Sequence, residues 1–473
     1  MCALPIAHQK GTILRRLIAV IPAAAFALSV SSGSLPAAAD SSAATVARAA
    51  AGPTQSVAAR AAAAWIGHQL AAGGDVLGSP TDWGMTQDAV FALAATGYGG
   101  DQIAKTSGRI FSSGTEYIGT SKQASKNWAR IAKTALALQV AARDATAFPT
   151  SEGARDLLQE VRAARNPDGS FGTSDFAFVH SLAVITLART PGGVPAESVR
   201  WLQNQQCTTA ASPDFGGYGT GGCTAVDGDA TALTIQALRA AGVSSEDASV
   251  ADAATWLTKH QNKASGGFPS SSGALNTNTT GLAGQALREL GRTSATAAGA
   301  RFIEGLQVQC TSLKGSAFTA ADVGAIAFDR TAWADSRAYG IGTTSGQWLR
   351  ASTQAVLGLT GSRLDQLSVT GARASLPKTG CSAGKPAPRV TASATANKSK
   401  LAVKVTPKRP TGKWTVRVQK KTRSAWQTVK PDYRVKGGSA VLTVNLPKGQ
   451  YRAKVLAKNG YRPAISQTVR LAR

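Results

Sequence analysis

A glycine-rich turn that leads into a capped, alanine-rich segment is the feature that most constrains this chain. In residues 214–242 the run FGGYG cannot continue a helix, because glycine opens left-handed backbone angles and costs entropy. The helix expected after it can be capped by Asp227 or Asp229 and can end at Gly242. The same order recurs between residues 61 and 361: a first helix, a turn rich in glycine and aromatic residues, and an alanine-rich second helix. The repeat therefore predicts an array of helical hairpins.

The repeat contains six hairpins, each of which would expose an apolar face if it stood alone. Stacking can bury these faces either in an open solenoid or in a closed ring. Small residues crowd the second helices, as in 230–237 and 279–286, and let their backbones approach closely. No polar terminal caps are evident in the sequence. We therefore predict a mainly α fold in which residues 61–361 form an (α/α)6 toroid.

The amino-terminal segment has the pattern of a signal peptide. Three basic residues accompany an apolar stretch at 17–30 that is short for a membrane span, and small residues at 37–39 fit a cleavage site. We therefore predict a signal peptide at 1–39 and a linker at 40–60. The protein is expected to be secreted, extracellular or associated with the cell surface, and not transmembrane.

The cysteines agree with export. Cys207, Cys223, Cys310 and Cys381 remain after the signal peptide, an even number suited to an oxidising compartment. Four cysteines allow three pairings; we predict Cys207–Cys223, which flank one turn, and Cys310–Cys381. Neither CxxC nor HExxH occurs in the sequence, so we expect no metal and no cofactor.

The positive charge is concentrated at the carboxyl-terminal end. The chain carries +26 in total, of which residues 389–473 contribute +20, while residues 40–388 contribute only +3. Five segments of the basic region alternate apolar and polar residues at period two, with turn dipeptides between them. This pattern predicts a small antiparallel β-sandwich, similar to bacterial immunoglobulin-like modules. Its cations either attract anionic cell-envelope polymers or keep strand faces soluble and discourage edge pairing; no nucleic acid is expected.

A Gly/Pro/Ser-rich linker is predicted at 362–388, between the two regions. It contains LPKTG at 376–380, which looks like a sortase sorting signal. That family places the motif before an apolar tail at the end of the chain, whereas here the 85 residues of the basic region follow. We therefore interpret the motif as a chance match or a relic.

Three of the hairpins carry a shared motif. Trp201 and Gln206 precede Gly-Gly-Tyr218, Trp256 and Gln261 precede Gly-Gly-Phe268, and NPDGSFG occupies 166–172. These segments resemble the prenyltransferase and squalene-oxidase repeat, in which the Gln and the aromatic residue tie the outer helix to the turn. The family includes class II terpene cyclases, protein prenyltransferase β-subunits and cobalamin carriers. The resemblance implies an α/α toroid and an isoprenoid ligand, and the order of a toroid followed by a β-domain suggests cobalamin as a further ligand; the fold does not select among these.

One segment resembles a catalytic motif of that family. Asp227-Gly228-Asp229-Ala230-Thr231-Ala232 is similar to the DxDDTA acid motif of class II terpene cyclases, with Ala230 in place of the third Asp. The resemblance implies that Asp229 is a general acid supported by Asp227. The alternative is a helix cap with a first-turn acid. Asp88 and Asn278 hold equivalent positions in the sequence, which favours capping.

The toroid predicts a ligand site. If the second helices lie parallel around a ring, their amino termini gather at one mouth with aromatic faces, acids and helix dipoles. The alternative is that the aromatic residues pack the turns, and that His180 is a satisfied core residue. We expect a binding protein, with a terpene cyclase-like enzyme as the alternative. The predicted ligand-binding residues are Trp83, Asp88, Trp128, Phe176, His180, Tyr218, Asn278 and Trp348.

Overall fold

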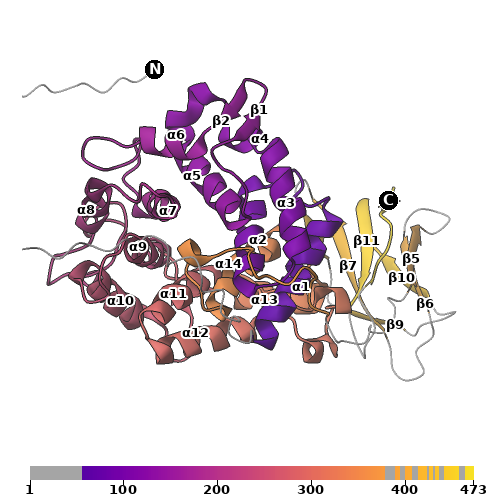
Figure 1. Cartoon of the computed structure of the whole chain (residues 1–473). Helices are drawn as coiled ribbons and strands as arrows, with labels where there is room; N and C mark the ends of the chain where they lie inside the picture. Colours follow the sequence, from indigo (N-terminus) through magenta and orange to yellow (C-terminus); the bar gives the residue numbers. More distant parts are fainter. Residues whose placement is uncertain are drawn as a thin grey trace, which may run out of the picture. The chain divides into compact units, whose positions relative to one another are not determined.

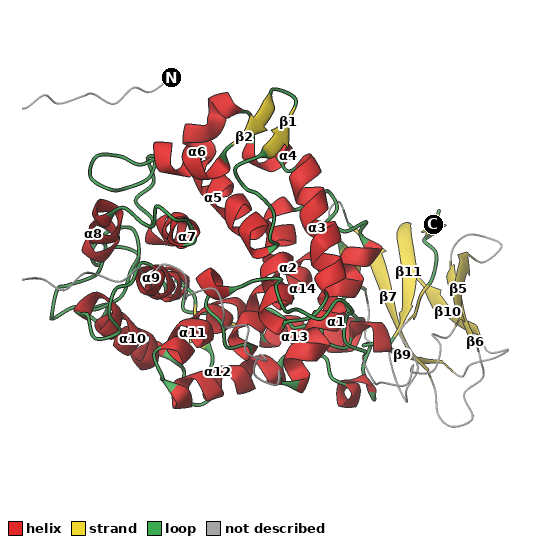
Figure 2. Ribbon diagram, viewed as in Figure 1, coloured by secondary structure: helices red, strands yellow, loops and turns green. Residues whose placement is uncertain are grey.

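A computed structural model of the chain describes residues 56–378, 389–394, 400–406, 414–422, 425–429, 432–435, 441–456 and 464–472. The predicted signal peptide and the linker up to residue 55 lie outside these ranges. The described chain is helical up to residue 378 and forms antiparallel strands from residue 389 onwards (Figures 1 and 2). Within the described ranges, no helix combines the length and the apolar character needed to cross a membrane.

Six helices make up an inner set whose mutual contacts form a closed circuit. Each member packs against the next in chain order, and the last packs against the first (Figure 1). Nearly every residue of the first member is buried, as expected for a helix with neighbours on all sides. The six are α2 (Trp83–Thr96), α5 (Ala124–Val140), α7 (Ala177–Ala188), α9 (Gly228–Ala240), α11 (Thr277–Glu289) and α14 (Ser345–Ala355).

A second set of helices packs on the outside of the inner set and buries only one face. In the helix 196–204, for example, only Ser198 and Leu202 are fully buried. The first helix begins at Val57, four residues before the start predicted at 61, with Ser56 as its cap. The outer helices are α1 (Val57–Ala72), α3 (Gly100–Ser113), α6 (Leu157–Ala163), α8 (Ala196–Asn204), α10 (Ala248–His260) and α12 (Thr293–Gly305). Shorter elements are α4 (Thr115–Ile118), α13 (Arg330–Tyr339), the hairpins β1 (Phe148–Thr150) with β2 (Gly153–Arg155) and β3 (Phe268–Pro269) with β4 (Leu275–Asn276), and the 3-10 helix η5 (Val356–Leu359).

Small residues allow two of the inner helices to meet backbone to backbone. A Cβ atom at Gly281 of α11 would lie 2.5 Å from the carbonyl oxygen of Gln354 in α14. A Cβ atom at Gly358, just after α14, would lie 2.9 Å from the Cα atom of Gly281. Such close packing leaves no room for a larger side chain at either glycine. The small residues seen in the sequence of these helices therefore allow the close contact between α11 and the segment that ends α14.

The segment 360–376, which we call the closing segment, crosses the carboxyl-terminal ends of five inner helices in turn. The sequence predicted a linker from 362 onwards, but much of this stretch is held by hydrogen bonds to helix ends. Its contacts are Ser362 O with Gln285 Nε2 of α11, Leu364 N with Gln236 Oε1 of α9, Asp365 O with Arg189 after α7, Val369 N with Val140 O of α5, and Arg373 N with Gly97 O after α2.

The basic region forms two antiparallel sheets around one apolar core, which confirms the antiparallel β region predicted from the alternation. In the strand 400–406, Leu401, Val403 and Val405 are fully buried, while Lys404 is exposed. Trp414 and Tyr451 are the largest buried side chains of this core. One sheet has the order β10 (Val441–Asn445), β6 (Lys400–Thr406), β5 (Arg389–Ala394); the other contains β7 (Trp414–Lys421), β8 (Trp426–Thr428), β9 (Tyr433–Val435), β11 (Gly449–Val455), β12 (Ala464–Ile465) and β13 (Val469–Leu471).

Candidate functional site

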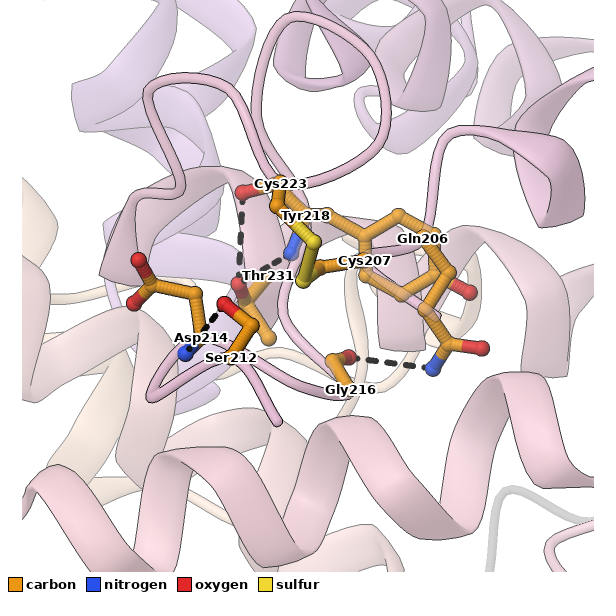
Figure 3. Close-up of a disulfide and its surroundings, with 8 residues drawn as sticks. All are labelled: Gln206, Cys207, Ser212, Asp214, Gly216, Tyr218, Cys223 and Thr231. Atoms are coloured by element: carbon orange, nitrogen blue, oxygen red, sulfur yellow. Dashed lines mark hydrogen bonds between the residues drawn. A yellow bond between two sulfur atoms is a disulfide. The ribbon is translucent and has the colours of Figure 1, made fainter. Parts of the chain in front are cut away.

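A disulfide closes the glycine-rich turn from which the sequence argument started. Cys207 and Cys223 are bonded, as predicted, across 16 positions of the chain (Figure 3). Cys310 is also disulfide-bonded, and Cys381, its predicted partner, lies outside the described residues. The disulfide fixes the base of the loop that leads into α9.

Inside this loop, Gln206 and Tyr218 tie the turn to its neighbours. Gln206 Nε2 donates to the carbonyl oxygen of Gly216 at 3.0 Å, and Thr231 Oγ1 of α9 accepts from Tyr218 N at 3.0 Å (Figure 3). The Tyr218 hydroxyl donates to the carbonyl oxygen of Ser249 at 2.8 Å, and burial raises the pKa of this phenol. The fully buried ring therefore holds the turn against α10 and offers no surface to a ligand.

The same glutamine contact recurs in two later repeats and links successive outer helices. Gln261 Nε2 donates to Gly266 O at 2.8 Å and to Ala295 O of α12 at 2.9 Å. Gln307 Nε2 donates to Gly324 O at 3.1 Å and to Ala58 O of α1 at 2.9 Å. The last of these bonds joins the end of α12 to the first helix, 249 positions earlier in the chain.

Asp227 caps α9, in agreement with the capping alternative. Its Oδ1 accepts from Ala230 N at 2.8 Å, and its Oδ2 accepts from Ser271 N at 3.1 Å. Asp229 lies in the first turn, where burial raises its pKa to about 6; the charge of Asp227 acts in the same direction, and a hydrogen bond with Thr279 opposes them. Asp229 Oδ1 is buried and has no hydrogen-bond partner among the described residues. The two carboxyl groups thus differ: one caps a helix, and the other is held closer to its neutral form.

Asp88 and Asn278 do not cap their helices, and the expectation that they do is wrong. The caps are Asp82, which accepts from Met85 N at 2.8 Å, and Asn276, which accepts from Thr279 N at 2.9 Å. Asp88 lies in the second turn of α2, and Asn278 is the second residue of α11, after the residues that cap these helices. Their side chains are free to make contacts between helices instead.

These side chains belong to a chain of polar contacts between four inner helices, which we call the polar relay: Lys133, Asp88, Gln354 and Asn278. Lys133 Nζ lies 2.5 Å from Asp88 Oδ1, and Gln354 Nε2 donates to Asp88 Oδ2 at 3.0 Å. Asn278 Nδ2 donates to Gln354 Oε1 at 2.5 Å. Asn278 Oδ1 is buried and unpartnered in the part of the chain that the structure describes. The relay thus joins α5, α2, α14 and α11 and ends at an acceptor atom without a donor.

A cavity of about 450 Å³ lies at one end of the relay, where α2, α11 and α14 begin. Arg350 and Asp82 form an ion pair at its edge, with 2.6 Å between Nη2 and Oδ2. Burial acts to raise the pKa of Asp82, but the Met85 N–H group and Arg350 outweigh it, so the pKa is lowered and the carboxylate stays charged. The cavity is lined by Gly78, Pro80, Asp82, Met85, Asn278, Phe328, Gly346, Gln347 and Arg350.

His180 is a satisfied core residue, as the alternative interpretation had it. Its Nδ1 accepts from Phe171 N at 3.2 Å, its Nε2 lies 2.8 Å from Ser174 O, and its ring centroid is 4.0 Å from that of Trp201. Burial lowers its pKa to about 4, so the ring is neutral at pH 7. Trp128 packs on the same ring at 5.0 Å. These residues form an aromatic cluster between α5, α7 and α8.

The remaining predicted aromatic residues pack helices and turns. Trp83 donates from Nε1 to Glu116 Oε2 at 3.0 Å, and Trp348 is fully buried and donates to Ser336 Oγ at 3.1 Å. Phe176 precedes α7 and stacks on Phe178 with 5.8 Å between ring centroids. Of the eight predicted ligand-binding residues, only Asp88 and Asn278 therefore belong to the relay, and only Asn278 lines the cavity.

Comparisons with protein-family models and with curated proteins found no match for this chain. Across the described residues, no group of three or more His, Cys, Asp or Glu side chains is placed to hold a metal ion. Any function must therefore be argued from the cavity, the relay and the charged surface themselves.

Sequence reasoning missed Lys133, Gln354 and Arg350. Gln354 contacts Asp88 across 266 positions, and Arg350 contacts Asp82 across 268 positions. A weak signal was present, because Lys133 and Gln354 are polar residues within otherwise apolar or small-residue stretches of predicted second helices. A polar residue at such a position needs a partner, but the sequence does not say which one.

Proposed function

We propose that the helical region is an (α/α)6 toroid and that the protein is a secreted, cell-envelope-associated binding protein. Two independent circuits support the toroid. The inner helices contact one another in a sequence that returns from α14 to α2. The glutamine bonds connect the outer helices and return from α12 to α1 through Gln307 and Ala58. An open solenoid has no reason to make either contact, because its first and last units lie apart.

The ligand of this protein binds in the cavity where α2, α11 and α14 begin. The observation that carries this proposal is a cavity of about 450 Å³ whose lining combines the apolar side chains of Met85 and Phe328 with the ion pair of Arg350 and Asp82. A concave site with apolar walls and a few convergent polar groups is the usual form of a small-molecule site.

Filling the cavity tests this proposal. Met85→Trp places an indole in the space, so the variant should lose a small molecule that the wild-type chain retains from a cell-envelope extract, as measured by mass spectrometry after gel filtration. Ser112→Trp, at an exposed position of α3, is the matched control and should retain it. Equal retention by all three proteins would place the ligand elsewhere or nowhere.

The basic region is proposed to be an immunoglobulin-like β-sandwich that attaches the protein to anionic surface polymers. Exposed cations stand on both sheets, including Lys404, Arg434 and Arg470, and exposed Lys448 lies in the turn between β10 and β11. Such a surface attracts polyanions in a salt-dependent way. Binding to polyphosphate should weaken in Lys404→Glu/Arg434→Glu and at high ionic strength; salt-independent binding would contradict a polyanion role.

A second candidate function rests on Asp229. Its raised pKa and its unpartnered Oδ1 are properties of a general acid and favour an enzyme similar to class II terpene cyclases. Ala230 replaces the third Asp of that motif, and the cavity is lined by other residues. The test is turnover of a polyprenyl substrate. If Asp229→Asn abolished such turnover, the binding-protein proposal would be wrong.

A further inference from the structure

Strand register decides which side chains share the outer face of the sheet that contains β7, β8, β11 and β13. Side chains alternate between the two faces of a strand, and antiparallel partners share a face. Val418 and Ala453 are fully buried in the core, so their chain neighbours Gln419 and Arg452, which are partners in the register, face outward. The outward residues at one end of this face, which we call the basic patch, are Gln419, Lys421, Trp426, Gln450, Arg452 and Arg470.

The basic patch is positively charged and contains no acid. Lys421 and Arg470 are exposed, and Arg452 is partly exposed. Residues 389–473 include a single acid, Asp432, and this carboxylate pairs with Arg417 Nε at 2.7 Å, outside the patch. The patch therefore presents a positive potential to an anionic partner.

Two neighbours in the basic patch hold Arg452 in place. Its Nε donates to Gln419 Oε1 at 2.8 Å, and its guanidinium carbon lies 4.3 Å from the ring centroid of Trp426. A guanidinium that is already fixed loses little freedom on binding, and its planar shape allows two parallel hydrogen bonds to one carboxylate. Trp426 is itself only partly buried, so it places an apolar surface beside these donors.

We propose that the basic patch binds an acidic polysaccharide, a polymer of sugar rings that carry carboxylates. The inference rests on the proposed attachment of the basic region to anionic polymers, and it names the face and the class of polymer. Carboxylates pair with Arg452 and its neighbouring cations, and the amide of Gln450 offers hydrogen bonds to sugar hydroxyl groups. The C–H face of a sugar ring packs on Trp426. A polyphosphate chain has charge but no such apolar face, so it engages the cations alone.

Polymers that differ in one property at a time test this selectivity by biolayer interferometry of the full chain. Polygalacturonate and polyglutamate both carry carboxylates, but only the first consists of sugar rings; dextran has rings without charge. At matched charge number and about 0.15 M salt, polygalacturonate should bind about fivefold more tightly than polyglutamate, as one aromatic contact allows, and dextran should bind most weakly. Equal affinity for the two carboxylate polymers, or tighter binding of polyphosphate or single-stranded DNA, would overturn the proposal.

Variants then assign the preference to the patch. Trp426→Ala removes the aromatic surface and should reduce the preference for polygalacturonate over polyglutamate to about twofold or less. Gln450→Glu and Thr443→Glu make the same change of charge at two exposed positions, the first in the patch and the second on the outer face of the other sheet. The first should weaken polygalacturonate binding about fivefold or more, and the second about twofold or less. Equal effects of the two would place the polymer elsewhere.

Two outcomes separate this inference from the proposed function. If polygalacturonate and polyglutamate bind equally and salt weakens both, the inference fails and the attachment to polyanions stands. If neither polygalacturonate nor polyphosphate binds, the attachment itself is wrong. Should Trp426→Ala fail to fold, judged by its melting transition, the preference of the wild-type chain and the comparison of Gln450→Glu with Thr443→Glu still decide.

Discussion

The two ends of the inner helices differ in how they are finished. At their carboxyl-terminal ends, the closing segment supplies hydrogen-bond partners to five helices in succession, and Arg363 pairs with Glu289 at 2.5 Å and with Asp365 at 2.8 Å. Where α2, α11 and α14 begin, no segment plays that part among the described residues; a cavity is present, and Asn278 Oδ1 has no partner.

The two ends therefore differ in what covers them: the closing segment bonds to groups at five helix ends, whereas a cavity lies where α2, α11 and α14 begin. Both ends contain buried polar atoms without partners among the described residues, such as Gln285 Oε1 and Gln236 Nε2 at the covered end and Asn278 Oδ1 at the other. The contacts of the closing segment favour stability, and the cavity leaves room for a ligand. Substitutions at each end test this comparison.

The largest effect is expected from Gly281→Val, which disturbs the contact on which both ends depend. The added Cβ atom would lie 2.5 Å from backbone oxygen of α14, where no flexible side chain can yield. We expect a loss of about 3 kcal/mol or more in the free energy of unfolding, measured by urea denaturation. Gly284→Ala is the control, since its Cβ atom would lie 3.4 Å from the nearest atom, and it should cost far less. Wild-type stability for Gly281→Val would mean that α11 and α14 are not in contact.

Arg363→Met should destabilise only the end that the closing segment covers. The side chain is 11 % exposed and holds both Glu289 and Asp365, so its removal leaves two half-buried carboxylates without this partner. A loss of about 2–3 kcal/mol in unfolding free energy is expected. Retention of the small molecule from the cell-envelope extract should not change, and a change would show that the two ends are coupled. Arg470→Met, on an exposed strand position, controls for loss of one cation.

The pH dependence of stability should distinguish Asp229 from His180. The pKa of Asp229 is raised from 3.8 to about 6, so the folded state holds a proton that the unfolded state releases, and this group lowers stability as pH rises from about 4 to 6. The pKa of His180 is lowered from 6.5 to about 4, so this group lowers stability as pH falls over nearly the same range. The two contributions therefore oppose each other.

Asp229→Asn removes the first contribution and leaves the second. The variant should gain about 2–3 kcal/mol relative to the wild type at pH 7, and this gain should vanish near pH 4. Thermal or urea unfolding between pH 4 and 7 measures it. A constant difference between the two proteins over that range would show that the pKa of Asp229 is not raised.

The smallest effect is expected at the rim of the cavity. Gln347→Ala removes an exposed side chain, so the free energy of unfolding should stay within about 0.5 kcal/mol of the wild type. Retention of the small molecule from the cell-envelope extract should fall by less than about threefold, because an exposed rim side chain contributes little to binding. A large loss of retention would show that the ligand depends on the rim.

Much of the local structure could be predicted from the sequence. Cap residues, helix-ending glycines and alanine-rich segments predicted the helices, and the alternation of apolar and polar residues predicted five of the strands. The Cys207–Cys223 disulfide followed from the proximity of two cysteines around one turn. The capping position was wrong for Asp88 and Asn278, because the true caps, Asp82 and Asn276, lie six and two residues earlier.

The amino-acid pattern is enough to predict which segments are helices or strands and which faces are buried, because these depend on neighbours within a few residues. Two features appear only in the folded chain: residues after 360 cover the helix ends, and Asp88 meets Gln354 across 266 positions. A polar residue on a buried helix needs a partner, but the choice of partner depends on how distant helices are placed. That placement comes from packing all the helices together, and it leaves no pattern in the residues around either member of the pair.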